Sequence, residues 1–259
     1  MFDSGFGGLT VARALVDLLP AEDLVYVGDT GRYPYGSKPL TDVRSYSTQI
    51  ARWLVDEHHV KAVVVACNTA SAAALDELTA TLSVPVFGVI DPGVRALSAV
   101  SESGRVGVIG TVGTISSGAY QIALSQAAPS VQLTCAACPG FVEFVERGET
   151  HSDQVRVLAE RLLAPIVDAK IDALLLGCTH YPFLARTITD VLGRSVVLVS
   201  SGEETAFDIW ERLGESNLLT AGDEPGRHQW FSSGDVSLFE KMGPILNMPE
   251  IENVQSVSW

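Results

Sequence analysis

The chain has 259 residues, of which 47% are hydrophobic, so it is long enough for one large domain or two ordinary ones with a well-filled core. A formal net charge of −14 argues against the nucleic-acid phosphate backbone as the main ligand, although small anions stay open. No apolar run approaches the roughly 20 residues that cross a bilayer, and the first residues lack the regions of a signal peptide. We therefore expect a soluble, cytoplasmic protein.

Short apolar runs alternate with helical stretches along the chain, which is the pattern of a mostly parallel sheet. In chain order, strands are expected at residues 24–28, 61–66, 84–89, 105–110, 131–135, 172–177, 195–199 and 229–231. Helices are expected at 41–57, 68–82, 154–169, 206–213 and 235–242. Pro165 should kink the third of these helices or mark a junction. The predicted fold class is α/β, with doubly wound and mostly parallel sheets.

The chain opens on a glycine-rich segment, Asp3-Ser4-Gly5-Phe6-Gly7-Gly8, which predicts a strand-to-helix turn. Only two residues precede it, so the strand that should deliver the turn is missing or barely present. The spacing is not G-x-G-x-x-G, because position 10 is Thr10, and a dinucleotide site is poorly supported. The segment either brings Asp3 and Ser4 to a ligand or is a plain tight turn.

Two similar domains are expected from the order of these elements. Asp91-Pro92-Gly93 is a turn signal between two strand–helix sets, and we expect the chain to cross there into a second domain. A second crossing is expected near residues 200–204, and the C-terminal remainder would complete the first domain. The predicted domains are residues 1–92 with 207–259, and residues 93–206.

Two cysteines stand in matched contexts. Ala66-Cys67-Asn68-Thr69 and Gly177-Cys178-Thr179-His180 each follow an apolar run that reads as a buried strand. Ligands of α/β sheets bind beyond the carboxyl ends of such strands, so the pattern suggests a shared cleft with one thiol from each domain. A thiol ahead of a helix also lies near the positive end of its dipole, which lowers the thiol pKa. Either cysteine alone reads better as a small buried hydrophobe, whereas the matched pair favours function.

Polar residues near these thiols have two readings each. Asn68, Thr69 and Thr179 can hold a carboxylate at a helix N-terminus or simply cap the helix. His180 can share a proton with a neighbouring thiol or be structural. The loop at residues 29–39, with two aromatics, two prolines and two glycines, favours a rigid binding loop. Glu146, taken alone, reads as a solvated surface carboxylate.

The other two cysteines, Cys135 and Cys138, form a C-x-x-C pair. No second pair accompanies them, and the five histidines show no matching ligand spacing. Ordinary thiols are therefore expected here, and no metal site.

Five segments, in this order along the chain, together resemble the glutamate racemase family of the cofactor-independent Asp/Glu racemase superfamily. They are Asp3-Ser4-Gly5-x-Gly7-Gly8-Leu9-Thr10-Val11, Gly28-Asp29-Thr30, Pro34-Tyr35-Gly36, Ala66-Cys67-Asn68-Thr69-Ala70 and Gly177-Cys178-Thr179-His180-Tyr181-Pro182. The resemblance implies two α/β domains with the active site between them, and interconversion of L- and D-glutamate that supplies D-glutamate for peptidoglycan. It also implies no pyridoxal phosphate, no metal, and no membrane or direct nucleic-acid partner. A homodimer is compatible with it.

The resemblance also assigns roles to individual residues. Cys67 would take the α-proton from D-glutamate and Cys178 from L-glutamate, assisted by Asp3 and His180 respectively, with Glu146 in a further assisting role. The residues implied in substrate binding are Asp3, Ser4, Tyr35, Gly36, Asn68, Thr69, Thr179 and His180, of which Tyr35 and Gly36 would meet the distal carboxylate mainly through backbone N–H groups. Where many members of the family carry Asp-Ser-Gly, this chain has Ser200-Ser201-Gly202, so one auxiliary polar contact is expected to differ.

Three alternatives stay open from the sequence. A sister enzyme acting on aspartate or another amino acid would use the same two thiols. A cysteine hydrolase would pair Cys178 with His180 and leave Cys67 idle. A non-catalytic protein would close two domains on a small acid without removing its α-proton.

Overall fold

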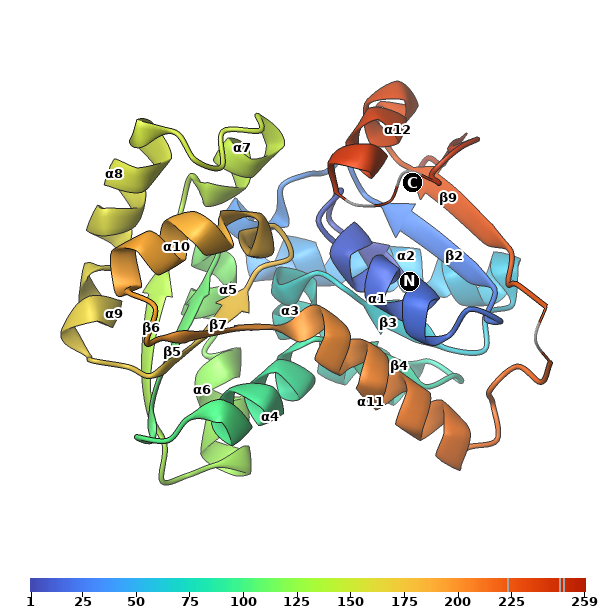
Figure 1. The fold of residues 1–259 in the computed structure, drawn as a ribbon. Helices are drawn as coiled ribbons and strands as arrows, with labels where there is room; N and C mark the ends of the chain where they lie inside the picture. Colours follow the sequence, from blue (N-terminus) through green and yellow to red (C-terminus); the bar gives the residue numbers. More distant parts are fainter. Residues whose placement is uncertain (223, 247, 249) are drawn as a thin grey trace. The chain divides into compact units, whose positions relative to one another are not determined.

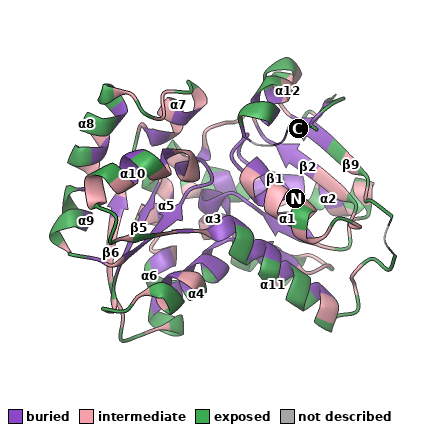
Figure 2. Cartoon of the chain, viewed as in Figure 1, coloured by how far each residue is buried: buried purple, intermediate pink, exposed green. Residues whose placement is uncertain are grey.

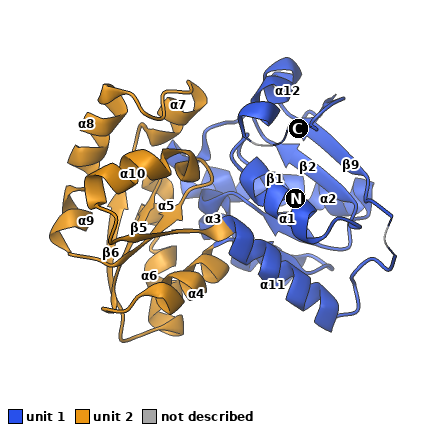
Figure 3. Ribbon diagram, viewed as in Figure 1, with its two compact units in different colours: residues 1–89, 202–259 blue, residues 90–201 orange. Residues whose placement is uncertain are grey.

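The computed structural model describes residues 1–222, 224–246, 248 and 250–259. Contacts divide the chain into two compact units, Met1–Val89 with Gly202–Trp259 and Ile90–Ser201 (Figure 3). Each unit has one sheet, and every strand pair in both sheets is parallel. The predicted α/β class is therefore confirmed.

The first unit contains a six-stranded sheet in the order β10-β9-β2-β1-β3-β4 (Figure 1). Its strands are β1 (Phe2–Asp3), β2 (Leu24–Gly28), β3 (Val63–Val65), β4 (Val86–Gly88), β9 (His228–Ser232) and β10 (Gln255–Ser256). Its helices are α1 (Leu9–Leu18), the 3₁₀ turn η1 (Tyr35–Ser37), α2 (Leu40–His58), α3 (Asn68–Thr81), α11 (Ser201–Glu215) and α12 (Val236–Ile245). Strand β1 has two residues, so the barely present first strand expected from the sequence is what the structure shows.

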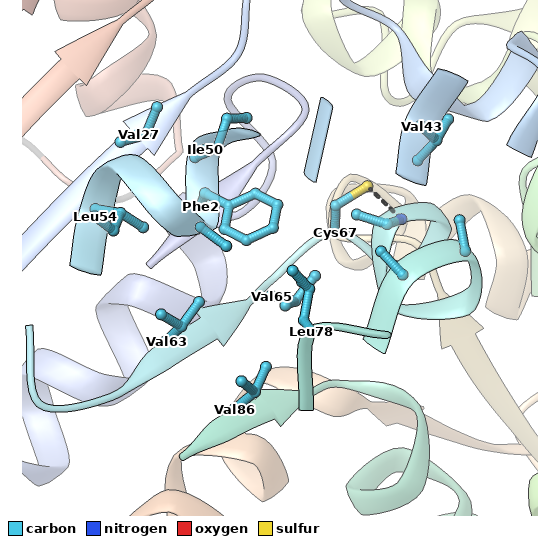
Figure 4. Packing of buried hydrophobic residues seen from close by; sticks show 14 of the residues in the cluster. Phe2, Val27, Val43, Ile50, Leu54, Val63, Val65, Cys67, Leu78 and Val86 are labelled. Carbon is cyan, nitrogen blue, oxygen red and sulfur yellow. Dashed lines mark hydrogen bonds between the residues drawn. The ribbon is translucent and has the colours of Figure 1, made fainter. Parts of the chain in front are cut away.

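Apolar side chains fix this sheet between its helices. Residues of β1, β2 and β3 that point to one face, such as Phe2 and Val65, pack against the apolar stripes of α2 and α3 (Figure 4). Ile50 and Leu54 lie at helical spacing on α2 and are fully buried there. Successive strand residues point to opposite faces, and all residues of β1 and β3 are buried, so both faces of these strands are covered. Polar side chains that meet a ligand are therefore expected at the strand ends. The strands β1, β3, β4 and β7 are buried along their whole length, as expected for the interior of parallel sheets, and Figure 2 colours the buried residues purple.

The second unit contains a four-stranded sheet in the order β6-β5-β7-β8. Its strands are β5 (Arg105–Gly110), β6 (Gln132–Ala137), β7 (Ala173–Gly177) and β8 (Val197–Ser200). Its helices are α4 (Ile90–Val100), α5 (Val112–Ser116), α6 (Ala119–Ala127), α7 (Phe141–Glu146), α8 (Asp153–Leu162), α9 (Ala164–Asp168), the 3₁₀ turn η2 (Tyr181–Leu184) and α10 (Ala185–Leu192).

Helices cover both faces of this second sheet. Gly93 of α4 approaches Leu175, whereas Ile166 of α9 lies on the side of Leu174. Adjacent residues of a strand point to opposite faces, so α4 and α9 lie on different sides of β7. The second sheet is therefore doubly wound, as predicted.

The two units share one strand order. In each, the first strand lies between the second and third, with the fourth outside the third, so that β2-β1-β3-β4 corresponds to β6-β5-β7-β8. In this arrangement the connections that follow the first and third strands run to opposite sides of the sheet. They leave a crevice between them at the carboxyl ends of the two strands. The switch points lie between β1 and β3 in the first unit and between β5 and β7 in the second.

Two sequence expectations on element bounds are wrong, and a third is decided between its two alternatives. Asp91-Pro92-Gly93 lies inside α4 and not in a turn, because a proline is tolerated in the first helical turn, where its missing N–H has no partner to lose. The helix expected at 206 begins at Ser201, so the second crossing near 200–204 coincides with a helix start. The single helix expected at 154–169 is two helices, α8 and α9, which meet at Leu163, just before Pro165. Of the two alternatives for Pro165, a kink or a junction, the junction is therefore confirmed.

Candidate functional site

Cys67 lies at the switch point of the first unit. It follows β3 and is the N-cap of α3, where its Sγ accepts the Ala70 N–H at 3.5 Å (Figure 4). Parallel pairing of Phe2 with Val65 brings the end of β1, and with it Asp3 and Ser4, beside this thiol. The expected strand–cysteine–helix arrangement is thus present around Cys67.

The prediction of a lowered pKa at Cys67 is wrong. Burial raises the pKa of the Cys67 thiol to about 11, and the neighbouring Asp3 carboxylate raises it as well. The Ala70 N–H and both the hydroxyl and N–H of Ser4 lower it, but by less. Removal of the thiolate from water outweighs the helix terminus here, so Cys67 is protonated at neutral pH.

Asp3 is held rigidly beside this thiol. Its side chain is 1% exposed and its Oδ2 accepts the Gly5 N–H at 2.9 Å. A Cβ at Gly8 would lie 2.5 Å from the Asp3 Cβ, so the turn requires glycine at that position. The glycine-rich segment therefore presents Asp3 and Ser4, and it is more than a plain turn.

Asn68 and Thr69 are the first two residues of α3 and are buried, with 3% and 2% exposure. Their place in the first helical turn puts them beside backbone N–H groups that have no partner within the helix. We refer to Asp3, Ser4, Cys67, Asn68 and Thr69 as the Cys67 group.

The loop after β2 is built as a rigid unit. Tyr35 is fully buried, and its hydroxyl donates to Asp29 Oδ2. Burial and the Asp29 carboxylate both raise the pKa of Tyr35 above its ordinary value. The hydroxyl of Tyr35 is therefore used inside the loop. That a ligand meets the backbone of Tyr35 and Gly36 stays a prediction of the resemblance.

Cys178 lies at the switch point of the second unit, directly after β7. The thiol is buried, with 7% exposure, and the Cys178 carbonyl accepts the Tyr181 N–H at 3.0 Å. The chain enters the 3₁₀ turn η2 here, with α10 beginning only at Ala185, so Cys178 does not cap an α-helix as Cys67 does.

His180 and Glu146 form a pair in the second unit. His180 is 2% exposed, and its Nε2 lies 3.3 Å from Glu146 Oε1 at the end of α7. The Glu146 side chain is 23% exposed, so its reading as a solvated surface carboxylate is wrong. We refer to Cys178, Thr179, His180 and Glu146 as the Cys178 group.

In the C-x-x-C pair, Cys138 is buried and Cys135 is partly exposed. Burial raises the pKa of Cys135 to about 11 and that of Cys138 to about 12. The Cys138 carbonyl accepts the Tyr181 hydroxyl at 3.0 Å, which ties this segment to the turn after Cys178. In the described part of the chain, no three His, Cys, Asp or Glu side chains gather as a metal site would require.

The sequence reasoning missed Thr111, which follows β5 at the switch point of the second unit. Its hydroxyl caps α5 by accepting the Thr114 N–H at 3.3 Å. The signal was present, because residues 105–110 were predicted as a strand and the next residue is polar. Only the strand order shows that Thr111 stands where Asp3 and Ser4 stand in the first unit.

A cavity of about 520 Å³ lies in the first unit, and no residue of the Cys67 group lines it. It is lined at the amino ends of the strands by residues that include Leu24, Lys61 and Val64. None of the predicted site residues lines it. Among the described residues, no helix is both long and apolar enough for a membrane span.

Comparisons with known proteins agree on one family. A model of the family described as Asp/Glu/Hydantoin racemase matches residues 7–206. The glutamate racemase of Acidothermus cellulolyticus is 48% identical, over 99% of this chain and 97% of its own length. A glutamate racemase isoform from Bacillus anthracis superimposes with a TM-score of 0.92 at 39% identity, over 100% of this chain and 95% of that one. The Francisella tularensis glutamate racemase solved with D-glutamate gives a TM-score of 0.91 at 34% identity, over 99% and 96%.

Proposed function

Since the chain belongs to the Asp/Glu/hydantoin racemase family, we propose that it interconverts L- and D-glutamate by proton transfer between two thiols. The observation that carries the proposal is the repeated placement of a buried cysteine at the carboxyl end of the third strand of each sheet. The choice of glutamate is supported by relatives of that name at 46–48% identity over 98–99% of the chain.

The chemistry requires two proton-transfer groups. The α-proton of an amino acid is very weakly acidic, so the base must lie close to it in a site whose fixed dipoles stabilise the carbanion. Inversion requires one face of the α-carbon to lose a proton and the opposite face to gain one. A thiolate on one face of the α-carbon and a thiol on the opposite face meet both requirements.

In the direction from D- to L-glutamate, the Cys67 thiolate removes the α-proton and becomes a thiol. The carbon–hydrogen electron pair stays on the substrate as a carbanion, which takes the Cys178 S–H proton on its other face. Cys178 ends as the thiolate. The reverse direction exchanges the two roles, and Cys67 rests in the protonated form that this direction needs.

The neighbouring side chains are proposed to support these steps. Asp3, beside Cys67, assists proton transfer there, and His180 does so at Cys178. Glu146 orients the His180 ring through the 3.3 Å contact at Nε2. Ser4, Asn68, Thr69 and Thr179 bind the amino and α-carboxylate groups, while backbone N–H groups of Tyr35 and Gly36 bind the distal carboxylate.

In the cell, we propose that this reaction supplies D-glutamate for peptidoglycan in the cytoplasm. Support for this role comes from the family resemblance of the five sequence segments. The chain's own geometry supports the proton transfer, and the two proposals can be tested separately.

Racemisation of aspartate by the same thiols is the second candidate. The family description covers both amino acids, and the residues that meet the distal carboxylate would decide between them. A hydrolase based on Cys178 is less well supported, because the buried Cys67 would have no role in it.

The test is proton NMR of L-glutamate in deuterated buffer with purified protein and no added cofactor, combined with chiral analysis. We expect the α-proton signal to disappear as D-glutamate appears. Parallel samples with L-aspartate separate the two candidate substrates. Binding of glutamate without exchange of its α-proton would overturn the proposal and favour a non-catalytic binding protein.

A further inference from the structure

The carboxylate of Asp29 is the centre of a hydrogen-bond network in the first unit. Asp29 follows β2 directly and is fully buried. Four side chains in the described part of the chain donate to it. Oδ1 accepts from Ser233 Oγ at 2.6 Å and from Trp259 Nε1 at 2.9 Å, and Oδ2 accepts from Arg32 Nε at 2.7 Å and from the Tyr35 hydroxyl.

These donors come from two distant parts of the sequence. Arg32 and Tyr35 belong to the loop after β2, whereas Ser233 and Trp259 belong to the C-terminal segment. The sheet explains their meeting, because β9 pairs with β2 along its whole length and β10 pairs with the end of β9. The Val257 N–H donates to the Ser232 carbonyl at 3.0 Å, which brings the following residues toward Asp29.

Contacts with aromatic rings also hold Arg32 and Trp259 in place. The Arg32 guanidinium lies 4.3 Å from the Tyr46 ring centroid and 5.2 Å from that of Trp259. The Trp259 ring also meets Trp53 of α2 edge-on at 5.8 Å. Trp259 is therefore fixed in place by its ring as well as by its indole N–H.

We propose that Trp259, acting through Asp29, is a positioning residue for the Tyr35–Gly36 backbone and hence for recognition of the substrate's distal carboxylate. Asp29 receives the Trp259 indole N–H on one oxygen and the Tyr35 hydroxyl on the other. Loss of the indole donor leaves Ser233 Oγ as the one side-chain donor to Oδ1 among the described residues, so the Asp29 carboxylate, and with it the Tyr35 hydroxyl on Oδ2, is held less firmly. The inference rests on the proposed function, since it concerns the binding of glutamate.

The substitution Trp259→Phe tests it, because phenylalanine keeps a ring against Arg32 and Trp53 but has no N–H. We expect the KM for glutamate to rise about five- to tenfold while kcat stays within about twofold. D-norvaline has the same carbon chain without the distal carboxylate, and its inhibition constant should stay within about twofold. A structural defect alone would weaken glutamate and norvaline together.

Trp53→Phe is the matched control, because Trp53 packs against Trp259 but is not one of the four donors to Asp29. Its KM should stay within about twofold of the wild-type value. Ser233→Ala removes another donor from the same Asp29 oxygen and should raise the KM in the same selective way. This second variant carries the test if Trp259→Phe does not fold.

The outcomes separate the two proposals. A wild-type protein without glutamate racemisation overturns the proposed function and this inference with it. An active wild type whose Trp259→Phe and Ser233→Ala variants match the Trp53→Phe control overturns this inference alone. A parallel rise of the KM and of the norvaline inhibition constant also overturns it.

Discussion

The Cys67 group and the Cys178 group occupy the same topological position in two sheets of the same strand order, but their surroundings differ. Cys67 caps a 14-residue helix and lies beside the Asp3 carboxylate. Cys178 enters a 3₁₀ turn, and the residue two positions on, His180, contacts Glu146. The topology thus repeats the position of the thiol, while the neighbouring loops place different ionisable side chains around each one.

The difference shows how two similar sheets can serve opposite steps of one reaction. Burial and the neighbouring Asp3 carboxylate both raise the pKa of Cys67, so this thiol rests protonated. An imidazole held by a carboxylate can both donate and accept a proton.

The largest effect is expected from Cys67→Ser and Cys178→Ser. A serine hydroxyl is a far weaker acid than a thiol, so either change should reduce racemisation at least about a thousandfold, as measured by chiral analysis. Cys135→Ser is the control, since Cys135 is half-buried and outside both groups, and it should stay within about twofold. Full turnover by Cys67→Ser would refute the two-thiol mechanism and favour a hydrolase-like use of Cys178.

Asp3→Asn and His180→Asn compare the two assisting groups directly. Each should lower kcat by about a hundredfold, because each removes a group that supports proton transfer at one thiol. Both thiols act in every turnover, so we expect losses of similar size. If the loss of kcat in one variant is at least about tenfold smaller than in the other, the two groups are not equivalent partners. Wild-type activity in either variant would lead to the same conclusion.

Glu146→Gln should have a smaller effect, a loss of about tenfold in kcat. Glutamine keeps an oxygen near His180 Nε2 but loses the negative charge, so the contact that orients the ring is kept in a weaker form. Glu149→Gln is the control, because Glu149 contacts Arg147 and not His180.

The smallest effect concerns how the free energy of unfolding depends on pH. The Cys67 thiol has an ordinary pKa of 9.0 and a folded pKa of about 11, so the unfolded chain releases this proton first as pH rises. The free energy of unfolding should therefore fall between about pH 9 and pH 11, by up to about 1.4 kcal/mol per pH unit from this group. Urea titrations of wild type and Cys67→Ser at three pH values isolate the contribution, since Cys135 and Cys138 are present in both. Equal slopes in the two proteins would contradict the raised pKa.

Local patterns were enough to predict most of the fold. Apolar runs predicted β2 and β5 to the residue, because a strand buried on both faces must be continuously apolar. Pro165 marked the junction between two helices. Asp91-Pro92-Gly93 predicted a turn where the structure has a helix, since a proline in the first helical turn and one in a loop look alike in sequence.

The sequence by itself determined the α/β class, the two matched cysteines and the polar residues that follow them, because each depends on neighbours along the chain. Tertiary structure alone decided the raised pKa of Cys67, the contact of His180 with Glu146, and the link from Trp259 to Asp29. These depend on burial and on strand pairing between residues up to 230 positions apart. The free energy of an ion or a hydrogen bond depends on what surrounds it in space, and that is settled only when the chain has folded.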